Sequence, residues 1–353
     1  MGRGVGLGRR VEAQAAVEGE RGGHVGDDEL DDGEARRHGR HRRDARGAGL
    51  GAIGHHARVH RTLGFTAPLC PDNLFGHLVA TAVPGVEEWH DGAYRRTLAL
   101  PGGPGVVSLR PGDAGIDATL TLTDDADLDA AEWLARRLLD LDADPVIVDD
   151  TLRADPVLAP LVDAAPGRRV PGAPDPEEFA VRAVLGQQVS TAAARTHAGR
   201  LVRGYGTPLP DGLAGPGSTL THLFPSSPAL TAVDPDELAM PRTRRRTLLT
   251  LVAALADGEV VLDPADVPGS RAALGALPGI GPWTVDSVAM RALGDPDAFL
   301  PTDLGIRVAA ERLGLPGKDR DLVARAEAWR PYRAYATQYL WAALDHAVNV
   351  MPG

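Results

Sequence analysis

Leu277-Pro278-Gly279-Ile280-Gly281-Pro282-Trp283 contains a Pro-Gly-x-Gly turn between two segments whose apolar residues have helical spacing. The first segment covers residues 270–276, and the second ends before Gly294. The pattern predicts two helices joined by a hairpin. At the start of the second helix, backbone N–H groups without helical partners point outward and can bind a phosphate. Taken alone, the same turn also joins ordinary packed helices.

A carboxylate follows the hairpin. Asp303, in the run Leu300-Pro301-Thr302-Asp303, lies twenty positions after Trp283. Hairpin, tryptophan and aspartate in this register resemble the helix-hairpin-helix (HhH-GPD) superfamily of base-excision DNA glycosylases. The runs at 82–87 (AVPGVE) and 92–98 (GAYRRTL) are similar to the N-terminal domain of the DNA-3-methyladenine glycosylase II (AlkA) family. The resemblance extends over residues 63–353.

Three segments are expected along the chain. Residues 1–62 are rich in Gly and His and have no aromatic residue and no periodicity, which is typical of a disordered low-complexity tail. Residues 63–168 predict an AlkA-type α+β domain with a small antiparallel sheet, and residues 169–353 a mostly α-helical helix-hairpin-helix domain. Strands are predicted at 94–100, 106–110 and 118–123, and helical patterns at 73–83, 127–141, 175–203, 241–256 and 330–348.

Composition excludes several classes of protein. No apolar run approaches the length of a membrane span and no signal-peptide core is visible, so we expect a cytoplasmic, nucleoid-associated protein. The single Cys70 excludes an internal disulfide framework, a thiolate zinc site and a four-cysteine iron-sulfur cluster. The net charge of −11 argues against a protein that coats DNA by bulk attraction, because such affinity comes chiefly from neutralised phosphates.

Asp303 is the candidate catalytic group. Cleavage of an N-glycosidic bond builds positive charge on the sugar, which a fixed carboxylate stabilises while it orients the attacking water. The alternative is a helix N-cap, because Thr302-Asp303 precedes a helical pattern, and the two roles can coexist. In relatives that also cut the strand, a lysine occupies the position of Trp283. Because the only lysine, Lys318, lies outside the motif, the resemblance implies a monofunctional enzyme.

A pocket for an extruded base needs side chains that stack on it. Trp283 and Trp341 are the candidates, with core packing as the alternative for each. An electron-rich indole face favours a cationic methylated purine. By resemblance His77 and Ser287 also line this pocket, where a well-studied relative has Phe and Tyr, so the lesion range stays open.

The resemblance also implies the DNA contacts. They are expected from Gly279, Ile280, Gly281, Thr284 and Gln188. Gln188 lies where a relative inserts a wedge into the space left by the extruded base, and a helix-bend residue is the alternative. No cofactor is expected to be required. A structural monovalent cation (Na or K) at the hairpin would use the main-chain carbonyls of Gly275, Leu277 and Ile280.

The basic run at 242–246 is interpreted as a solvated helix face rather than a set of phosphate contacts. Together these observations predict a monomeric, monofunctional DNA glycosylase acting on duplex DNA that contains alkylated bases of the 3-methyladenine and 7-methylguanine type. The alternatives are a non-catalytic helix-hairpin-helix DNA-binding protein and a remnant of a fused alkylation-response regulator.

Overall fold

The computed structural model describes residues 56–353, which belong to one compact unit. Its N-terminal part is a five-stranded antiparallel sheet of order β1-β5-β4-β3-β2. The strands are β1 (Ala57–Leu63), β2 (Glu87–His90), β3 (Ala93–Leu100), β4 (Gly103–Pro111) and β5 (Ile116–Leu122). Buried and partly exposed positions alternate along β5, as expected for a sheet with one face in the core.

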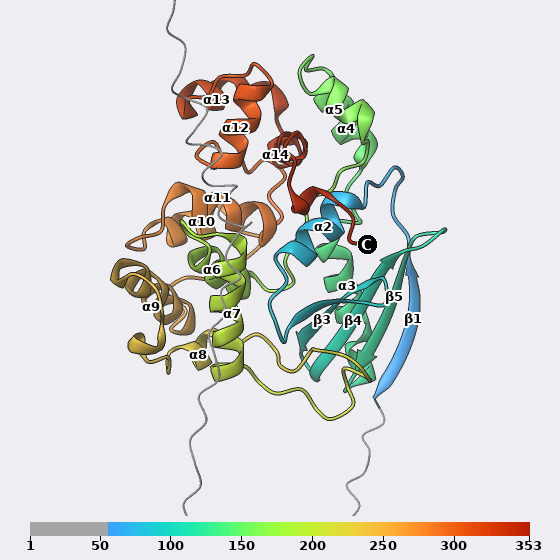
Figure 1. The fold of residues 1–353 in the computed structure, drawn as a ribbon, viewed down its shortest axis with the longest axis vertical. Coiled ribbons are helices and arrows are strands. Elements are labelled where there is room, and N and C mark those ends of the chain that lie inside the picture. The colour runs from blue at the N-terminus through green and yellow to red at the C-terminus, as the bar shows by residue number, and fades with distance from the viewer. Residues whose placement is uncertain (1–55) are drawn as a thin grey trace, which may run out of the picture. The chain divides into compact units, whose positions relative to one another are not determined.

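Two helices cover one face of the sheet, α2 (Asp72–Ala80) and α3 (Leu128–Leu138) (Figure 1). The core between them and the sheet contains Phe75 of α2, Ala135 of α3, and Tyr94 and Leu109, which are paired across β3 and β4. On the opposite face, Val106 packs with Leu213 and Leu220 of a long connecting segment.

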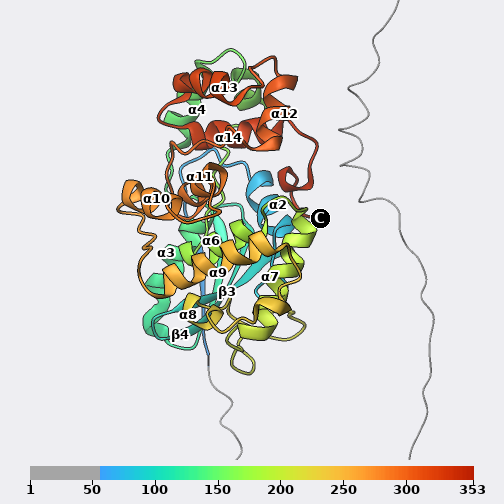
Figure 2. The ribbon, with the colours of Figure 1, turned by 90° about the vertical axis from the view of Figure 1, so that its left-hand side faces the viewer.

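The rest of the chain is helical and has its own, larger core. Its helices are α4 (Pro145–Arg153), α5 (Ala159–Ala164), α6 (Pro176–Leu185), α7 (Thr191–Tyr205), α8 (Ser227–Leu230), α9 (Arg242–Ala256), α10 (Val267–Gly275), α11 (Pro282–Arg291), α12 (Leu304–Arg312), α13 (Asp319–Ala326) and α14 (Arg333–Ala342). Figure 2 shows α9 lying across α6, with α10 and α11 beside them. The α+β part followed by a helical part is the predicted fold class.

A buried ion-pair network joins the sheet to α6. Arg96 of β3 contacts Glu178 of α6 at 2.8 Å, and Arg182 of α6 contacts Glu87 of β2 at 3.0 Å. Buried charges need such partners, because removing one would leave the other desolvated and unpaired. The network therefore fixes α6, and with it the turn at its C-terminal end, relative to the sheet.

The structure corrects two predictions. Residues 57–62 were assigned to the tail, but they form the edge strand β1, paired with β5. Most of β1 is exposed, so its sequence lacks a strong apolar signal; residues 1–55 lie outside the described residues. The helical pattern at 175–203 is two helices, because Gly186 ends α6 and Ser190 caps α7 by accepting from Ala193 N. The domain boundary expected at residue 168 stays a prediction.

None of the helices in the described part of the chain combines the length and apolar character that crossing a membrane requires.

Candidate active site

The predicted hairpin joins α10 to α11. Gly279 at its tip has φ +85°, a conformation that favours glycine, and a Cβ there would overlap the side chain of Thr247 on α9. Gly281 O accepts from the N–H groups of Thr284 and Val285 at 3.0 and 3.2 Å, which starts α11. Gly279 is exposed, so the hairpin tip is available to a ligand while its base is packed against α9.

Three N–H groups hold the carboxylate of Asp303. Trp283 Nε1 donates to Oδ2, Trp341 Nε1 donates to Oδ1, and Ile306 N donates to Oδ1, each at 3.0 Å. Asp303 is thus the N-cap of α12 and also the shared acceptor of two tryptophans from α11 and α14. Both functions anticipated for its side chain, cap and oriented carboxylate, are geometrically compatible. Because each donor is fixed on a helix, the carboxylate has a defined orientation.

Gly305 makes room for this arrangement. A Cβ at Gly305 would lie 3.1 Å from Asp303 Oδ1 and 3.2 Å from Nε1 of Trp341, tighter than most real contacts. A glycine in the first turn of α12 therefore allows the indole to lie against the helix start. The sequence analysis did not single out this residue, although a glycine two positions after the aspartate is visible in the chain.

The face of α11 that begins at Trp283 continues through Ser287 and Arg291, each four residues further along and therefore on one side of the helix. Ser287 is buried. The guanidinium of Arg291 lies 5.5 Å from the centroid of the Trp341 ring, on which it stacks. Burial lowers the pKa of Arg291 to about 10, against the opposing charge of Asp303.

His77 of α2 lies close enough to this face of α11 for the charge of Arg291 to affect its pKa. The pKa of its imidazole is held well below the usual value, first by burial and then by the charges of Arg291, Arg182 and His346. Its ring is therefore neutral at physiological pH. Of the predicted pocket residues, the structure joins Trp283 and Trp341 directly through Asp303 and sets Ser287 on the same helix face as Trp283. His77 lies on α2, within range of the charge of Arg291.

The turn between α6 and α7 lies against the hairpin. Gln187 Nε2 donates to Thr284 Oγ1 at 3.0 Å and to Gly279 O at 3.4 Å. The next residue, Gln188, is exposed and has φ 56°, the left-handed conformation that a residue other than glycine seldom adopts. Thr284 is only 2% exposed, so its hydroxyl holds the hairpin rather than facing a ligand.

The three main-chain carbonyls predicted to bind a monovalent cation differ in whether they already accept a backbone hydrogen bond. Leu277 O accepts from Ile280 N at 3.2 Å, whereas the carbonyls of Gly275 and Ile280 accept no backbone N–H within the described residues. Two oxygens at the hairpin thus keep free lone pairs, which suits a cation that takes oxygen ligands.

The basic run on α9 is only partly a solvated face. Arg244 is buried, and Arg245 donates to Met240 O at 3.1 Å and to Pro235 O at 2.9 Å. Arg242 and Arg246 are exposed. Arg245 therefore holds the loop before α9, and Arg242 and Arg246 are the solvated part of the run.

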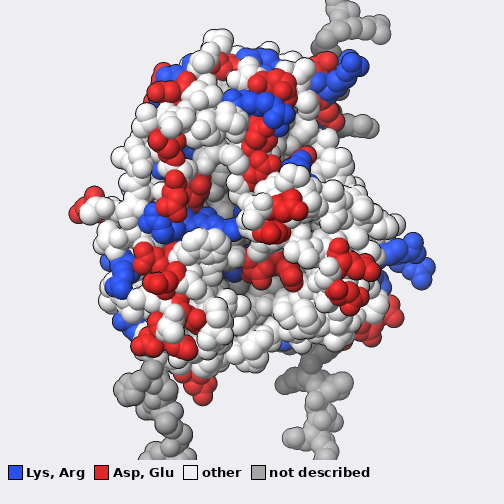
Figure 3. Space-filling model, turned by 180° about the vertical axis from the view of Figure 1, so that it is seen from behind, with Lys and Arg blue, Asp and Glu red and all other residues white. Residues whose placement is uncertain are grey.

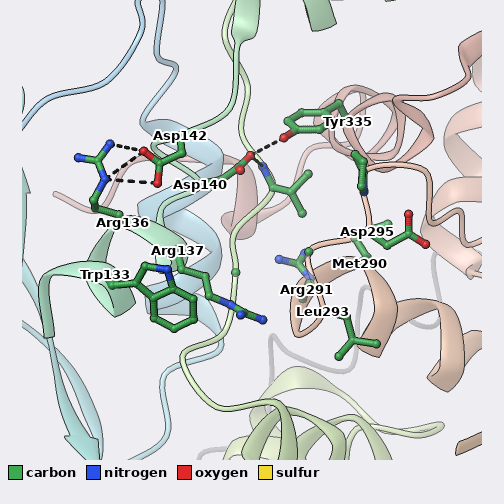
Figure 4. A pocket seen from close by; sticks show the side chains of 14 residues that line it. Trp133, Arg136, Arg137, Asp140, Asp142, Met290, Arg291, Leu293, Asp295 and Tyr335 are labelled. Carbon is green, nitrogen blue, oxygen red and sulfur yellow. Dashed lines mark hydrogen bonds and ion pairs between the residues drawn. The ribbon is translucent and has the colours of Figure 1, made fainter. Parts of the chain in front are cut away.

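A cavity of about 270 Å³ lies between α3 and the ends of α11 and α14 (Figure 4). Trp133 and Arg137 line one side, and Arg291 and Leu293 the other. Neither Asp303 nor any predicted pocket residue lines it. Seen from behind, the surface mixes acidic and basic side chains, with a short basic band in the hollow at its middle (Figure 3).

Sequence reasoning missed Arg291 and Gln187. The only visible signal for Arg291 is a charge within the apolar run of α11, where Val288, Ala289, Met290 and Ala292 are all buried. Gln187 was visible as a polar residue at a helix end, and nothing local indicates its bond to the hairpin.

Comparisons with known proteins agree with this architecture. The AlkA N-terminal domain family matches residues 60–175. A Mycobacterium tuberculosis protein called a probable bifunctional transcriptional activator/DNA repair enzyme AlkA is 54% identical over 81% of this chain and 57% of its own length. The chain therefore spans little more than half of that relative.

Two further proteins are matched over nearly their whole length by this chain. The 3-methyladenine DNA-glycosylase of Archaeoglobus fulgidus superposes with a TM-score of 0.67 at 20% identity, over 80% of this chain and 97% of that one, which shows a shared fold. The DNA-3-methyladenine glycosylase 2 of Escherichia coli K12 is 35% identical, over 79% of this chain and 96% of its own length. The chain belongs to the AlkA family of DNA-3-methyladenine glycosylases.

Proposed function

We propose that this protein is a monofunctional DNA glycosylase that removes alkylated bases, of the 3-methyladenine and 7-methylguanine type, from duplex DNA. The observation that carries the proposal is the carboxylate of Asp303, held between the indole N–H groups of Trp283 and Trp341. Family membership supports the same reaction, since the E. coli relative is named for 3-methyladenine.

In this mechanism the bond between C1′ of the sugar and the base nitrogen breaks, and its electron pair leaves with the base. A cationic methylated base becomes neutral as it leaves, so it needs no acidic partner. Positive charge grows on the sugar, where the fixed carboxylate of Asp303 stabilises it. The oxygen of a water molecule then bonds to C1′, and Asp303 accepts the proton that this water loses.

The surroundings of Asp303 fit an extruded base. The indole faces of Trp283 and Trp341 offer stacking surfaces that suit a cation. The neutral imidazole of His77 adds no positive charge that would repel such a base. With Trp283 rather than a lysine on α11, no amine stands at this position to form a Schiff base with the sugar.

DNA binding is assigned to two neighbouring turns. The exposed tip at Gly279 and the start of α11 at Gly281 present backbone groups to a phosphate. A monovalent cation on the carbonyls of Gly275 and Ile280 would add positive charge there. Gln188, exposed and in a strained conformation, is the wedge that enters the DNA stack. The protein acts in this proposal as a monomer on nucleoid DNA.

Base release from methylated duplex DNA tests the proposal, with intact protein compared with Asp303→Asn. The asparagine oxygen can still accept from Ile306 N and cap α12, whereas its NH2 group cannot accept from the indole N–H of Trp283. The variant therefore keeps the helix cap and removes the charge together with one indole hydrogen bond. Asp266→Asn is the matched control, because Asp266 caps α10 in the same way, through Gly269 N. Strand nicking is scored before and after alkali.

We expect methylpurine release to fall at least about a hundredfold in Asp303→Asn and to persist in Asp266→Asn, with nicks only after alkali. Nicking without alkali would contradict a monofunctional mechanism. Retained DNA binding with no release by the wild-type protein would favour the non-catalytic DNA-binding protein instead.

A further inference from the structure

Arg291 is a buried cation whose fixed position does not come from a carboxylate. It is 7% exposed, and none of the ion pairs among the described residues includes it. Its Nη1 donates to Pro171 O at 2.9 Å, and its own carbonyl accepts from Ala173 N at 3.0 Å. The side chain and the backbone of Arg291 are thus both bonded to the segment at 171–173, which leads into α6.

The guanidinium anchored in this way stacks on the tryptophan that holds Asp303. Its carbon lies 5.5 Å from the centroid of the Trp341 ring, and Trp341 Nε1 donates to Asp303 Oδ1 at 3.0 Å. The Trp341 ring is packed at the edge of the helical core and against Gly305, and its hydrogen bond holds only the Nε1 edge. The cation over the ring face adds a further restraint on the tilt of the ring, so Arg291 acts on Asp303 through Trp341.

Burial disfavours the charge of Arg291. The carboxylate of Asp303 supports this charge and Arg182 of α6 opposes it, but Asp303 forms no ion pair with Arg291 within the described residues. The charge of Arg291 lowers the pKa of His77 on α2. Arg137 and Asp140 line the same cavity as Arg291. Burying a charge without a close partner costs stability, so an apolar side chain of similar volume would serve the core as well. A role in positioning accounts for a cation here.

We propose that Arg291 is a positioning residue for base excision: it fixes the plane of Trp341 and thereby the indole N–H that orients Asp303. The proposal rests on the function proposed above, in which Asp303 is the catalytic carboxylate. Arg291 itself touches neither the sugar nor the base.

The chain supplies a matched control in the same cavity. Arg137 stacks on Trp133 at 5.3 Å and faces Arg291 across the cavity (Figure 4). Trp133 is 55% exposed, and the two indoles that donate to Asp303 are those of Trp283 and Trp341. Arg137 also donates to Ala292 O at the end of α11. Arg137→Met therefore removes the same kind of contact from the same cavity, together with this bond, and leaves Arg291, Trp341 and Asp303 in place.

The test compares Arg291→Met, Arg291→Lys and Arg137→Met with the wild-type protein. Single-turnover base release gives the chemical step, and the Kd for duplex DNA with an abasic site gives binding. Arg291→Met should slow release about ten- to a hundredfold while Kd changes less than about threefold, because a small misplacement of a catalytic group affects the chemical step most. Arg291→Lys should recover part of the rate, and Arg137→Met should keep it all.

A second measurement needs no activity. The indole N–H signal of Trp341, assigned with Trp341→Phe, should move in the NMR spectrum of DNA-free Arg291→Met and stay in place in Arg137→Met. If the wild-type protein releases no base, the proposed function fails, and this signal still decides the role of Arg291. An unmoved signal, an unchanged rate in Arg291→Met, or equal losses in the two Met variants would overturn the proposal.

Discussion

The indole Nε1 of Trp283 donates to Oδ2 of Asp303 at 3.0 Å, so the first turn of α11 is bonded to the first residue before α12. Trp283→Phe would keep an aromatic face and remove this donor. A hydrogen bond to a charged group is worth about 1.5–3 kcal/mol, which predicts a roughly ten- to hundredfold slower single-turnover release of methylpurines. Trp133→Phe, which changes an exposed indole away from the site, should leave the rate unchanged. Equal rates for Trp283→Phe and the wild-type protein would show that the bond is not used.

We expect a side chain at the hairpin tip to destabilise the protein. Gly279 combines φ +85° with a backbone that lies against Thr247, so Gly279→Ala should destabilise the protein by about 1–3 kcal/mol and lower its Tm by several degrees. Gly281→Ala is the control, because Gly281 has φ −98° and open space where a Cβ would lie. Thermal unfolding of both variants checks this. Similar Tm values for the two would mean that the hairpin adapts to a side chain.

The sequence predicts an element well when the element's own residues carry a clear periodic pattern. The helix expected at 241–256 is α9 (Arg242–Ala256), and the strand expected at 94–100 is β3 (Ala93–Leu100), because each has a clear period of its own. The edge strand β1 was missed, since its pairing with β5 across about sixty residues of sequence defines it more than its own exposed side chains do.

The same distinction applies to the candidate site. The register of the hairpin and Asp303 was visible because it lies within one short stretch. Arg291 bonds to a carbonyl 120 residues away, and Gln187 bonds to Thr284 97 residues away. A side chain whose role is set by such a distant partner has no signature in its own neighbourhood, so only the folded structure reveals it.

His77 predicts a pH effect on stability. Burial and neighbouring arginines hold its pKa well below the usual value, so the folded protein binds its proton less readily than the unfolded chain does. The unfolded chain takes up the proton near pH 6.5, and stability therefore falls as the pH drops below that value. His77→Phe should lose less stability than the wild-type protein between pH 7.5 and 5.5, as measured by urea unfolding. An identical loss in both proteins would show that the imidazole takes up its proton in the fold as readily as in the unfolded chain.

For Asp140 we expect the opposite dependence of stability on pH. Burial raises its pKa to about 6, although Tyr335 OH donates to Oδ2 at 2.8 Å and Val170 N at 3.2 Å. Between about pH 4 and 6 the folded protein holds a proton that the unfolded chain has released, so this group's contribution to stability is lost as the pH rises through 6. The full effect is about 1–3 kcal/mol.

Asp140→Asn tests this directly. Asparagine resembles the neutral carboxyl, tolerates the φ of 51° at this position, and can still accept from Tyr335. Relative to the wild-type protein, the variant should therefore gain about 1–3 kcal/mol between pH 4 and pH 7.5. The comparison between two proteins cancels the titration of the other carboxylates, which both share. A difference in stability that stays constant across this range would show that Asp140 ionises in the fold as it does in water.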